Sequence, residues 1–148
     1  MAAVLRLSLA VLTLLFGSGG ALADDGLTVA QAWVRPSIGQ TGSTALYFTV
    51  TNGGSSGDAL LAVDVADAAR SELHQTVDDN GVVGMRAVGE LPLPPGASLV
   101  FEPRGYHVML MGLKQPLQPG GHLGATLRFK THPPVVIDAA VSMTPPGN

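Results

Sequence analysis

Four residues between positions 74 and 109 combine a regular spacing with a chemistry that could bind a metal. His74, Met85, His107 and Met109 form the pattern His-x10-Met-x21-His-x-Met. Two imidazoles and two thioethers make an uncharged, soft ligand set that suits Cu(I), whereas Mg²⁺ and Ca²⁺ prefer oxygen ligands. The chain has no cysteine. A thiolate site is therefore excluded, and with it the blue-copper centre of an electron-transfer protein.

The second pair of these residues falls within a segment that has the pattern of a β-strand. Residues i and i+2 of a strand share a face, so His107 and Met109 should point the same way with Cα atoms about 7 Å apart. Val108 and Leu110 should then face the apolar core.

The first pair is expected on a hairpin, and the turn type decides how its two strands align. A four-residue turn over 78–81 pairs Val77 with Val82 and sets His74 directly opposite Met85. A two-residue type I′ turn at positions 80 and 81 instead sets Met85 opposite Thr76 and leaves His74 diagonal to it. We expect the first register; in either one, both ligands share a face of the hairpin.

Short strands separated by Gly- and Pro-rich turns occupy the chain from position 27 onward. We expect one domain over 24–143, an all-β antiparallel sandwich or Greek-key barrel, with a flexible tail over 144–148. The Ala-rich 65–69 could form a helical turn. The strands are expected at 27–34, 43–52, 58–65, 71–77, 82–88, 98–102, 106–113, 123–130 and 135–142.

Residues 1–23 have the pattern of a cleaved secretory signal peptide. Arg6 is followed by an uncharged run over 7–16 that is too short to span a membrane, and Ala21-Leu22-Ala23 forms a small-x-small cleavage sequence. We therefore expect an exported protein without a membrane span after cleavage. No cysteine follows the cleavage site to carry a lipid. A formal net charge of −3 without a basic stripe argues against nucleic acid as a partner.

Other residues that could do chemistry have simpler interpretations. Met111 shares the face of Met109 and could be a spare ligand, but packing is the favoured role. His122 and His132 are expected to be solvated loop residues, and Asp78 with its neighbours a solvated turn and not a calcium loop. Trp33 and Tyr47 are interpreted as core or sheet aromatics, and Arg35 as a surface residue.

The ligand spacing resembles that of the PCuAC family of periplasmic copper chaperones, and the resemblance covers essentially the whole chain after the signal segment. Pro103-Arg104-Gly105 departs from the family's usual Pro-Gly-Gly, but no ligand is lost. The other segments that resemble the family are Ala32-Trp33-Val34-Arg35, Ala45-Leu46-Tyr47 with the strand to Asn52, Glu72-Leu73-His74, Gly105 to Leu113, and Leu127-Arg128-Phe129.

The resemblance implies a cupredoxin-like β-sandwich in the periplasm that binds one Cu(I) ion per chain through His74, Met85, His107 and Met109. It also implies a copper-accepting partner protein in cytochrome c oxidase copper-centre assembly. Some members bind a second copper in a C-terminal extension rich in His and Met. The tail here offers only Met143, so we expect no second site.

The favoured hypothesis is therefore a monomeric Cu(I) carrier that is not an enzyme. The site should be shallow and near a sheet edge. Its copper affinity should decrease as the pH drops below the usual histidine pKa of about 6.5. The alternative is an exported β-sandwich binding or adhesion module without a metal. A hydrolase is disfavoured because no nucleophile elbow, HExxH or clustered carboxylate pair is present.

Overall fold

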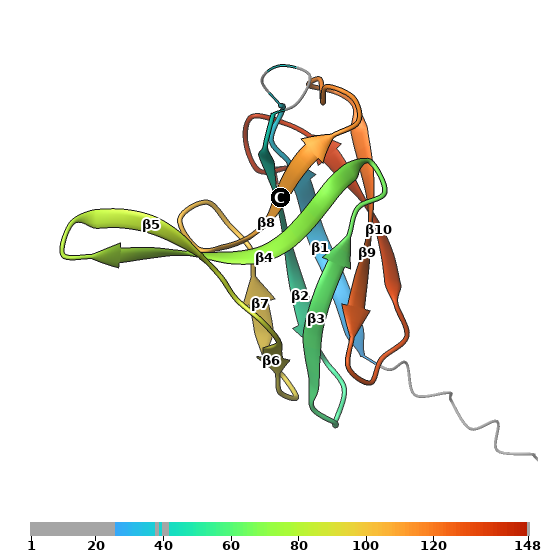
Figure 1. Ribbon diagram of the computed structural model, residues 1–148. Helices are drawn as coiled ribbons and strands as arrows, with labels where there is room; N and C mark the ends of the chain where they lie inside the picture. The colour runs from blue at the N-terminus through green and yellow to red at the C-terminus, as the bar shows by residue number, and fades with distance from the viewer. Residues whose placement is uncertain (1–25, 38, 40–41, 148) are drawn as a thin grey trace, which may run out of the picture.

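The computed structural model describes residues 26–37, 39 and 42–147, and this part of the chain is β-strand and turn without helix (Figure 1). The expected signal segment 1–23 lies outside the described residues. Within them, no helix is long and apolar enough to cross a membrane. The ten strands are β1 (Leu27–Val34), β2 (Thr44–Asn52), β3 (Asp58–Asp64), β4 (Ala68–Asp79), β5 (Val82–Ala87), β6 (Leu91–Leu93), β7 (Ser98–Val100), β8 (Tyr106–Leu113), β9 (His122–Phe129) and β10 (Val135–Val141).

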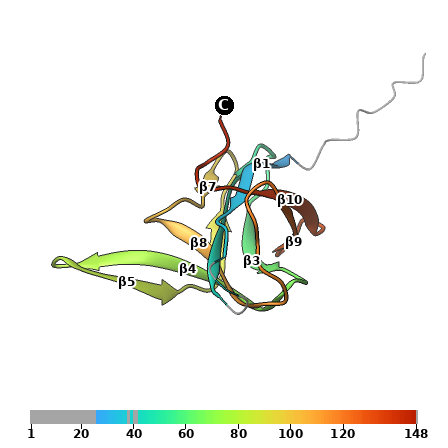
Figure 2. The ribbon, with the colours of Figure 1, turned by 90° about the horizontal axis from the view of Figure 1, so that it is seen from above.

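The strands form one hydrogen-bonded sheet that folds over on itself into a sandwich. Its order is β5-β4-β8-β2-β1-β10-β9-β3-β6, and β7 pairs with β2 outside this path. Figure 2, which views the molecule from above, shows β4 and β8 on one side and β3, β9 and β10 on the other. The all-β sandwich is as expected. One detail differs from an antiparallel fold, because β1 runs parallel to β10 where the two layers join.

Most strands lie where the alternating pattern predicts them, and three details differ. The 65–69 segment forms no helical turn; Ala68 donates a single turn hydrogen bond to the carbonyl of Val65 and begins β4. Strand β4 continues through Asp79, so the first two residues of the expected four-residue turn belong to a strand. Strand β6 was not predicted because Pro92 lies in its middle. It sits at the sheet edge, where a proline is tolerated.

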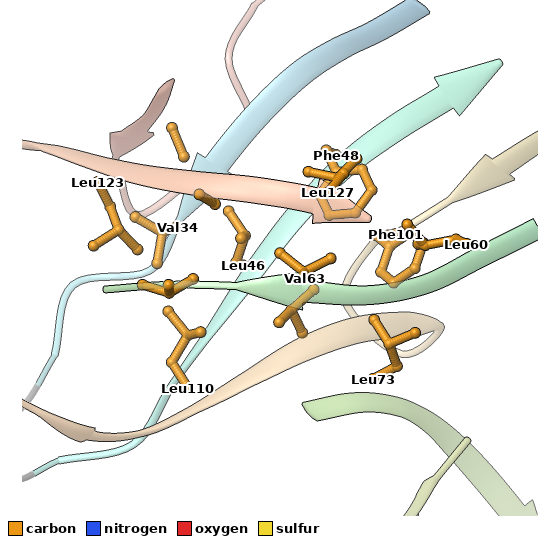
Figure 3. Packing of buried hydrophobic residues seen from close by; sticks show 14 of the residues in the cluster. Val34, Leu46, Phe48, Leu60, Val63, Leu73, Phe101, Leu110, Leu123 and Leu127 are labelled. Atoms are coloured by element: carbon orange, nitrogen blue, oxygen red, sulfur yellow. The ribbon is translucent and has the colours of Figure 1, made fainter. Parts of the chain in front are cut away.

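Side chains from both layers form one apolar core, and this core fixes which way β8 faces. Val108 and Leu110 are fully buried in it, as predicted, so His107 and Met109 lie on the opposite face. Figure 3 shows Leu73 and Leu110 of one layer packed toward Val63 and Leu127 of the other. Burial of one such side chain contributes about 1.5–3 kcal/mol, which holds β8 firmly in place.

Strand β4 extends beyond the sandwich and, with β5, forms a projecting hairpin. The pairing of β4 with β8 ends at Gln75, after which β4 pairs only with β5. Figures 1 and 2 both show this hairpin reaching away from the rest of the molecule. We call residues 76–85 the hairpin arm and the remaining strands the body.

Candidate metal centre

The register of the hairpin arm differs from the one we expected and matches the alternative. Met85 lies opposite Thr76, and His74 lies opposite Ala87. The turn contains only Asn80 (φ 53°) and Gly81 (φ 86°), and two positive φ values define a type I′ turn. This turn type is favoured because its backbone twist matches that of the flanking strands. Met85 is therefore diagonal to His74 on the same face.

Pairing between β4 and β8 brings the two halves of the sequence motif together. His74 lies directly opposite His107, and Glu72 lies directly opposite Met109. The two imidazole ring centroids are 5.7 Å apart and the ring planes are inclined by 57°. The spacing of the motif could not establish this juxtaposition, because it depends on a contact between distant segments.

Each imidazole is anchored through one nitrogen, while its other nitrogen is buried without a hydrogen-bond partner. Nε2 of His74 lies 3.0 Å from Oε2 of Glu72, and Nδ1 of His107 lies 3.2 Å from the carbonyl oxygen of Gly105. Since both neighbours are acceptors, these nitrogens carry the protons of the neutral rings. Nδ1 of His74 and Nε2 of His107 then present free lone pairs. Among the described residues, they are the two buried side-chain nitrogen or oxygen atoms without a hydrogen-bond partner.

A pocket of about 340 Å³ opens beside these rings and is lined by both thioether residues. His107 is only 4% exposed, whereas Met85 is 62% exposed at the edge strand. The structure thus brings three of the predicted ligands into one pocket, with the ring of His74 next to His107. The lining consists of Arg35, Ala45, Tyr47, Thr76, Val83, Met85, Pro103, Arg104, His107 and Met109.

The surroundings of the buried imidazole in this site favour its neutral form. Burial lowers the pKa of His107; the hydrogen bond to Gly105 opposes this shift, and the nearby His74 adds to it. The hydrogen bond from His74 lowers the pKa of Glu72; desolvation opposes this shift, and the charge of Arg70 adds to it. A neutral imidazole is the form that can donate a lone pair to a metal.

Groups of charged or imidazole side chains that could bind a harder ion are absent from the described part of the chain. No three His, Cys, Asp or Glu side chains gather there into a group that could hold a metal. The pocket beside the imidazoles instead offers the thioethers of Met85 and Met109, which favour a soft ion.

The other residues weighed from the sequence have identifiable roles. Sδ of Met111 lies 3.5 Å from the guanidinium of Arg70, so its sulfur is already occupied. His122 begins β9 instead of a loop, and its Nδ1 lies 2.8 Å from a carboxylate oxygen of Asp138. His132 is partly buried, with its ring edge-on to a neighbouring phenylalanine.

The two residues interpreted as core or sheet aromatics lie in neighbouring strands. Trp33 and Tyr47 are buried with ring centroids 4.6 Å apart, and Tyr47 also lines the pocket.

Sequence reasoning missed the residues that surround the ligands. Glu72 and Arg70 share the face of His74, because alternate residues of a strand point the same way. That period alone could have identified both as neighbours of the site. Arg104, which lines the pocket, lies in a loop whose course no local pattern predicts.

Comparisons with known proteins identify a family for this chain. Residues 27–141 match the family model described as "Putative lipoprotein LpqE-like". The "Putative lipoprotein Lxx21020" of Leifsonia xyli is 42% identical over 107 residues, which is 71% of this chain and 63% of that protein. The chain therefore spans less than two thirds of the length of this relative.

Three solved structures share the fold. The apo PCuAC domain from PmoF1 superposes with a TM-score of 0.66 at 29% identity, covering 79% of this chain and 93% of that one. The copper-bound PCuAC domain from PmoF2 gives 0.65 at 27% identity over 78% and 92%. The Cu(I) form of DR1885 from Deinococcus radiodurans gives 0.60 at 29% over 81% and 82%.

The match to these domains confirms the expected cupredoxin-like β-sandwich. It also agrees with the family resemblance seen in the sequence, and the family model spans most of the chain. The chain belongs to the LpqE-like family, which is a PCuAC family.

Proposed function

We propose that the protein is a copper chaperone that binds one Cu(I) ion through His74, Met85, His107 and Met109. The observation that carries this proposal is the pair of buried imidazole nitrogens without partners, beside a pocket lined by two thioethers. A buried polar atom without a hydrogen bond costs about 1–3 kcal/mol. Coordination of a metal by both nitrogens would remove that cost.

The anchoring of each ring supports the same role. Histidines that bind metals commonly donate their other N–H to a carboxylate or a backbone carbonyl, which fixes the tautomer and the ring orientation. His74 donates to the carboxylate of Glu72, and His107 donates to the carbonyl of Gly105. The soft, uncharged ligands favour Cu(I) over Cu(II) and Zn(II).

The exposed position of Met85 supports a carrier more than a permanent copper centre. The pocket is open to solvent, and the fourth ligand lies on the projecting hairpin arm. A partner protein could replace this thioether as a ligand without unfolding the body. We propose that the ion passes in this way to a copper-accepting protein of cytochrome c oxidase copper-centre assembly, a role that the family resemblance supports.

We further propose that the protein acts outside the cytoplasm, in the periplasm, as a monomer without enzymatic activity. The signal-like pattern over 1–23 supports export, as do the descriptions of the family and the Leifsonia relative as lipoproteins. Fractionation of cells into periplasm and cytoplasm, with immunodetection, tests the location.

Anaerobic titration with Cu(I) against a competing chelator tests the site. Wild type should bind one tight equivalent, and His107→Ala and Met109→Ala should each weaken binding about 100-fold or more, because each loses a ligand. Met143→Ala, which removes an exposed methionine in the C-terminal segment, is the matched control and should bind like wild type. Wild type that binds no Cu(I) would refute the proposal and favour the metal-free binding module.

Delivery is tested separately in cells that lack the gene. Cytochrome c oxidase activity under limiting copper should fall and be restored by wild type but not by a His107→Ala/Met109→Ala variant. Equal restoration by this variant would show that copper delivery through the site is not the function.

A further inference from the structure

A chain of polar contacts runs along the face of the sheet that carries the candidate ligands, and it ends at His74. Oε2 of Glu72 lies 3.0 Å from Nε2 of His74, and Oε1 of Glu72 lies 3.0 Å from Nη2 of Arg70. The same Arg70 nitrogen lies 3.5 Å from the sulfur of Met111. Both oxygens of the carboxylate are therefore engaged, one by the imidazole and one by the guanidinium.

The position of Glu72 makes this arrangement chemically significant. Glu72 lies directly opposite Met109 in the pairing of β4 with β8, so its carboxylate is within the neighbourhood of the ligands. A free carboxylate there could itself bind a metal, and hard oxygen ligands suit Zn(II) and Cu(II) better than Cu(I). An arrangement that occupies both oxygens removes this competing ligand.

We propose that Glu72, held by Arg70, is the positioning residue of the metal site: it orients His74 so that Nδ1 is the donor, and it is itself withheld from the ion. This inference rests on the proposed function and adds a determinant of metal selectivity to it. The two histidines then use opposite nitrogens, Nδ1 of His74 and Nε2 of His107, because one is anchored by a side chain and the other by the backbone.

The exposure of these groups allows the test variants to fold. The side chains of Arg70 and Glu72 are 67% and 38% exposed, so their ion pair contributes little to stability. The side chain of His74 is 16% exposed, so its orientation is sensitive to the loss of its acceptor. Glu90 forms an ion pair of 3.1 Å with Lys130 in another part of the molecule, so Glu90→Gln is a matched control.

Nuclear magnetic resonance of the apo protein tests the positioning without any metal. Long-range proton–nitrogen spectra at a pH where imidazoles are neutral should show His74 protonated on Nε2 and His107 protonated on Nδ1. Glu72→Ala should speed the exchange of the His74 ring proton with water and shift its Nε2 resonance, while the His107 signals stay unchanged. A His74 ring protonated on Nδ1 in wild type, or unchanged His74 signals in Glu72→Ala, would overturn the proposal.

Metal titrations then test the consequence for binding. Glu72→Ala should weaken Cu(I) binding about 10–100-fold, the usual effect of losing such an acceptor. Glu72→Gln should lose less than Glu72→Ala, because its amide oxygen can still accept the imidazole proton. Glu90→Gln should bind like wild type. Equal Cu(I) affinity in wild type and Glu72→Ala would also overturn the proposal.

Removing the clamp tests whether Glu72 is withheld from the ion. Arg70→Gln frees one carboxylate oxygen, so Zn(II) affinity should rise about fivefold, a modest gain because exposed ion pairs are weak. This gain should disappear in Arg70→Gln/Glu72→Gln, which lacks the carboxylate. Unchanged Zn(II) affinity in Arg70→Gln would refute the withholding role.

The outcomes separate this inference from the proposed function. If wild type binds no Cu(I), the proposed function fails, and the apo spectra still decide whether Glu72 orients His74. If wild type binds Cu(I) and Glu72→Ala binds equally well, the function stands and the positioning role is wrong.

Discussion

Strands β8 and β5 each carry a methionine of the candidate site, but they lie in opposite surroundings. Strand β8 pairs with β4 on one side and β2 on the other, and its inward face enters the core. Strand β5 is at the sheet edge, where it pairs with β4 alone. Met109 is accordingly partly buried, whereas Met85 is 62% exposed. One part of the site is built into the body, and the other is carried on an arm.

This difference teaches how a carrier can hold an ion and still release it. Ligands on β8 are kept in place by the burial of Val108 and Leu110 behind them. The tip of the arm has no such support, and Val82 and Val83 are exposed there. Segments with few buried apolar contacts open locally at low free-energy cost. We therefore expect the ligands on the body to determine the affinity for the ion and the arm to determine how fast the ion is released.

The largest expected effect distinguishes the two regions by stability. Leu110→Ala should lower the free energy of unfolding by about 3 kcal/mol, because it leaves a cavity in the core. Val82→Ala on the arm should change it by less than about 0.5 kcal/mol, since its side chain is exposed. Denaturant unfolding followed by circular dichroism measures both. Comparable losses would mean that the arm is part of the cooperative core.

The next effect compares the two thioethers directly as ligands. Met109→Ala should weaken Cu(I) binding about 100-fold, and Met85→Ala only about tenfold. The exposed side chain of Met85 must be ordered when it binds the ion, and this costs about 0.5–1.5 kcal/mol, which reduces its net contribution to binding. Met111→Ala is the control, since its sulfur contacts Arg70. Competition titrations with a Cu(I) chelator give the three affinities.

Equal losses for Met85→Ala and Met109→Ala would show that the arm is as well ordered as the body. A loss in Met111→Ala as large as that in Met109→Ala would make Met111 a ligand and require a different set of donors.

Acid should weaken the body at Asp58, the first residue of β3. Burial alone would raise the pKa of Asp58, but hydrogen bonds from the backbone N–H groups of Ala59, Thr131 and His132, with the charge of His132, lower it overall. A carboxylate with a lowered pKa stabilises the fold fully above its unfolded value of about 3.8, and this stability is lost as the pH falls through the folded pKa.

Asp58→Asn should therefore lower the free energy of unfolding by about 1–2 kcal/mol at neutral pH, because it weakens these charge-assisted hydrogen bonds. The difference from wild type should shrink as the pH falls below about 3.8. Denaturant unfolding over a series of pH values measures it, with the exposed Asp138→Asn as the control. A difference that is independent of pH would exclude the carboxylate charge as its source.

The parts of the fold that the sequence predicts are those set by local patterns. Alternation placed His107 and Met109 on one face, with Val108 and Leu110 in the core, because side-chain direction follows the strand period. Strand β6 was missed because Pro92 resembles a loop residue until a sheet edge accommodates it. The pairing of His74 with His107 was also out of reach, since packing between distant segments decides it.

The register of the arm lies between these cases. Both turns over 78–81 satisfy the local sequence, and they differ only in whether Asp78 and Asp79 belong to the strand. The sidechain oxygen of Asp78 accepts the N–H of Gly81 at 2.8 Å, and this closes the shorter turn. A single substitution at the turn can therefore test which conformation the arm needs.

The smallest expected effect comes from Gly81, whose positive φ the type I′ turn requires. Gly81→Ala should destabilise the arm by about 1 kcal/mol, because alanine is strained at this positive φ. A Cβ there would meet no atom within 4 Å, so no steric clash adds to the strain. Gly84→Ala is the matched control on the same hairpin, since a Cβ at Gly84 also meets nothing and its φ is not positive. Amide hydrogen exchange should rise about fivefold at Val77, which lies opposite Gly84 in the hairpin, in Gly81→Ala but not in Gly84→Ala, while exchange at Leu110 and global unfolding stay nearly unchanged. A fall in global stability equal to the local one would mean that arm and body open together, and the division of the site between them would be wrong.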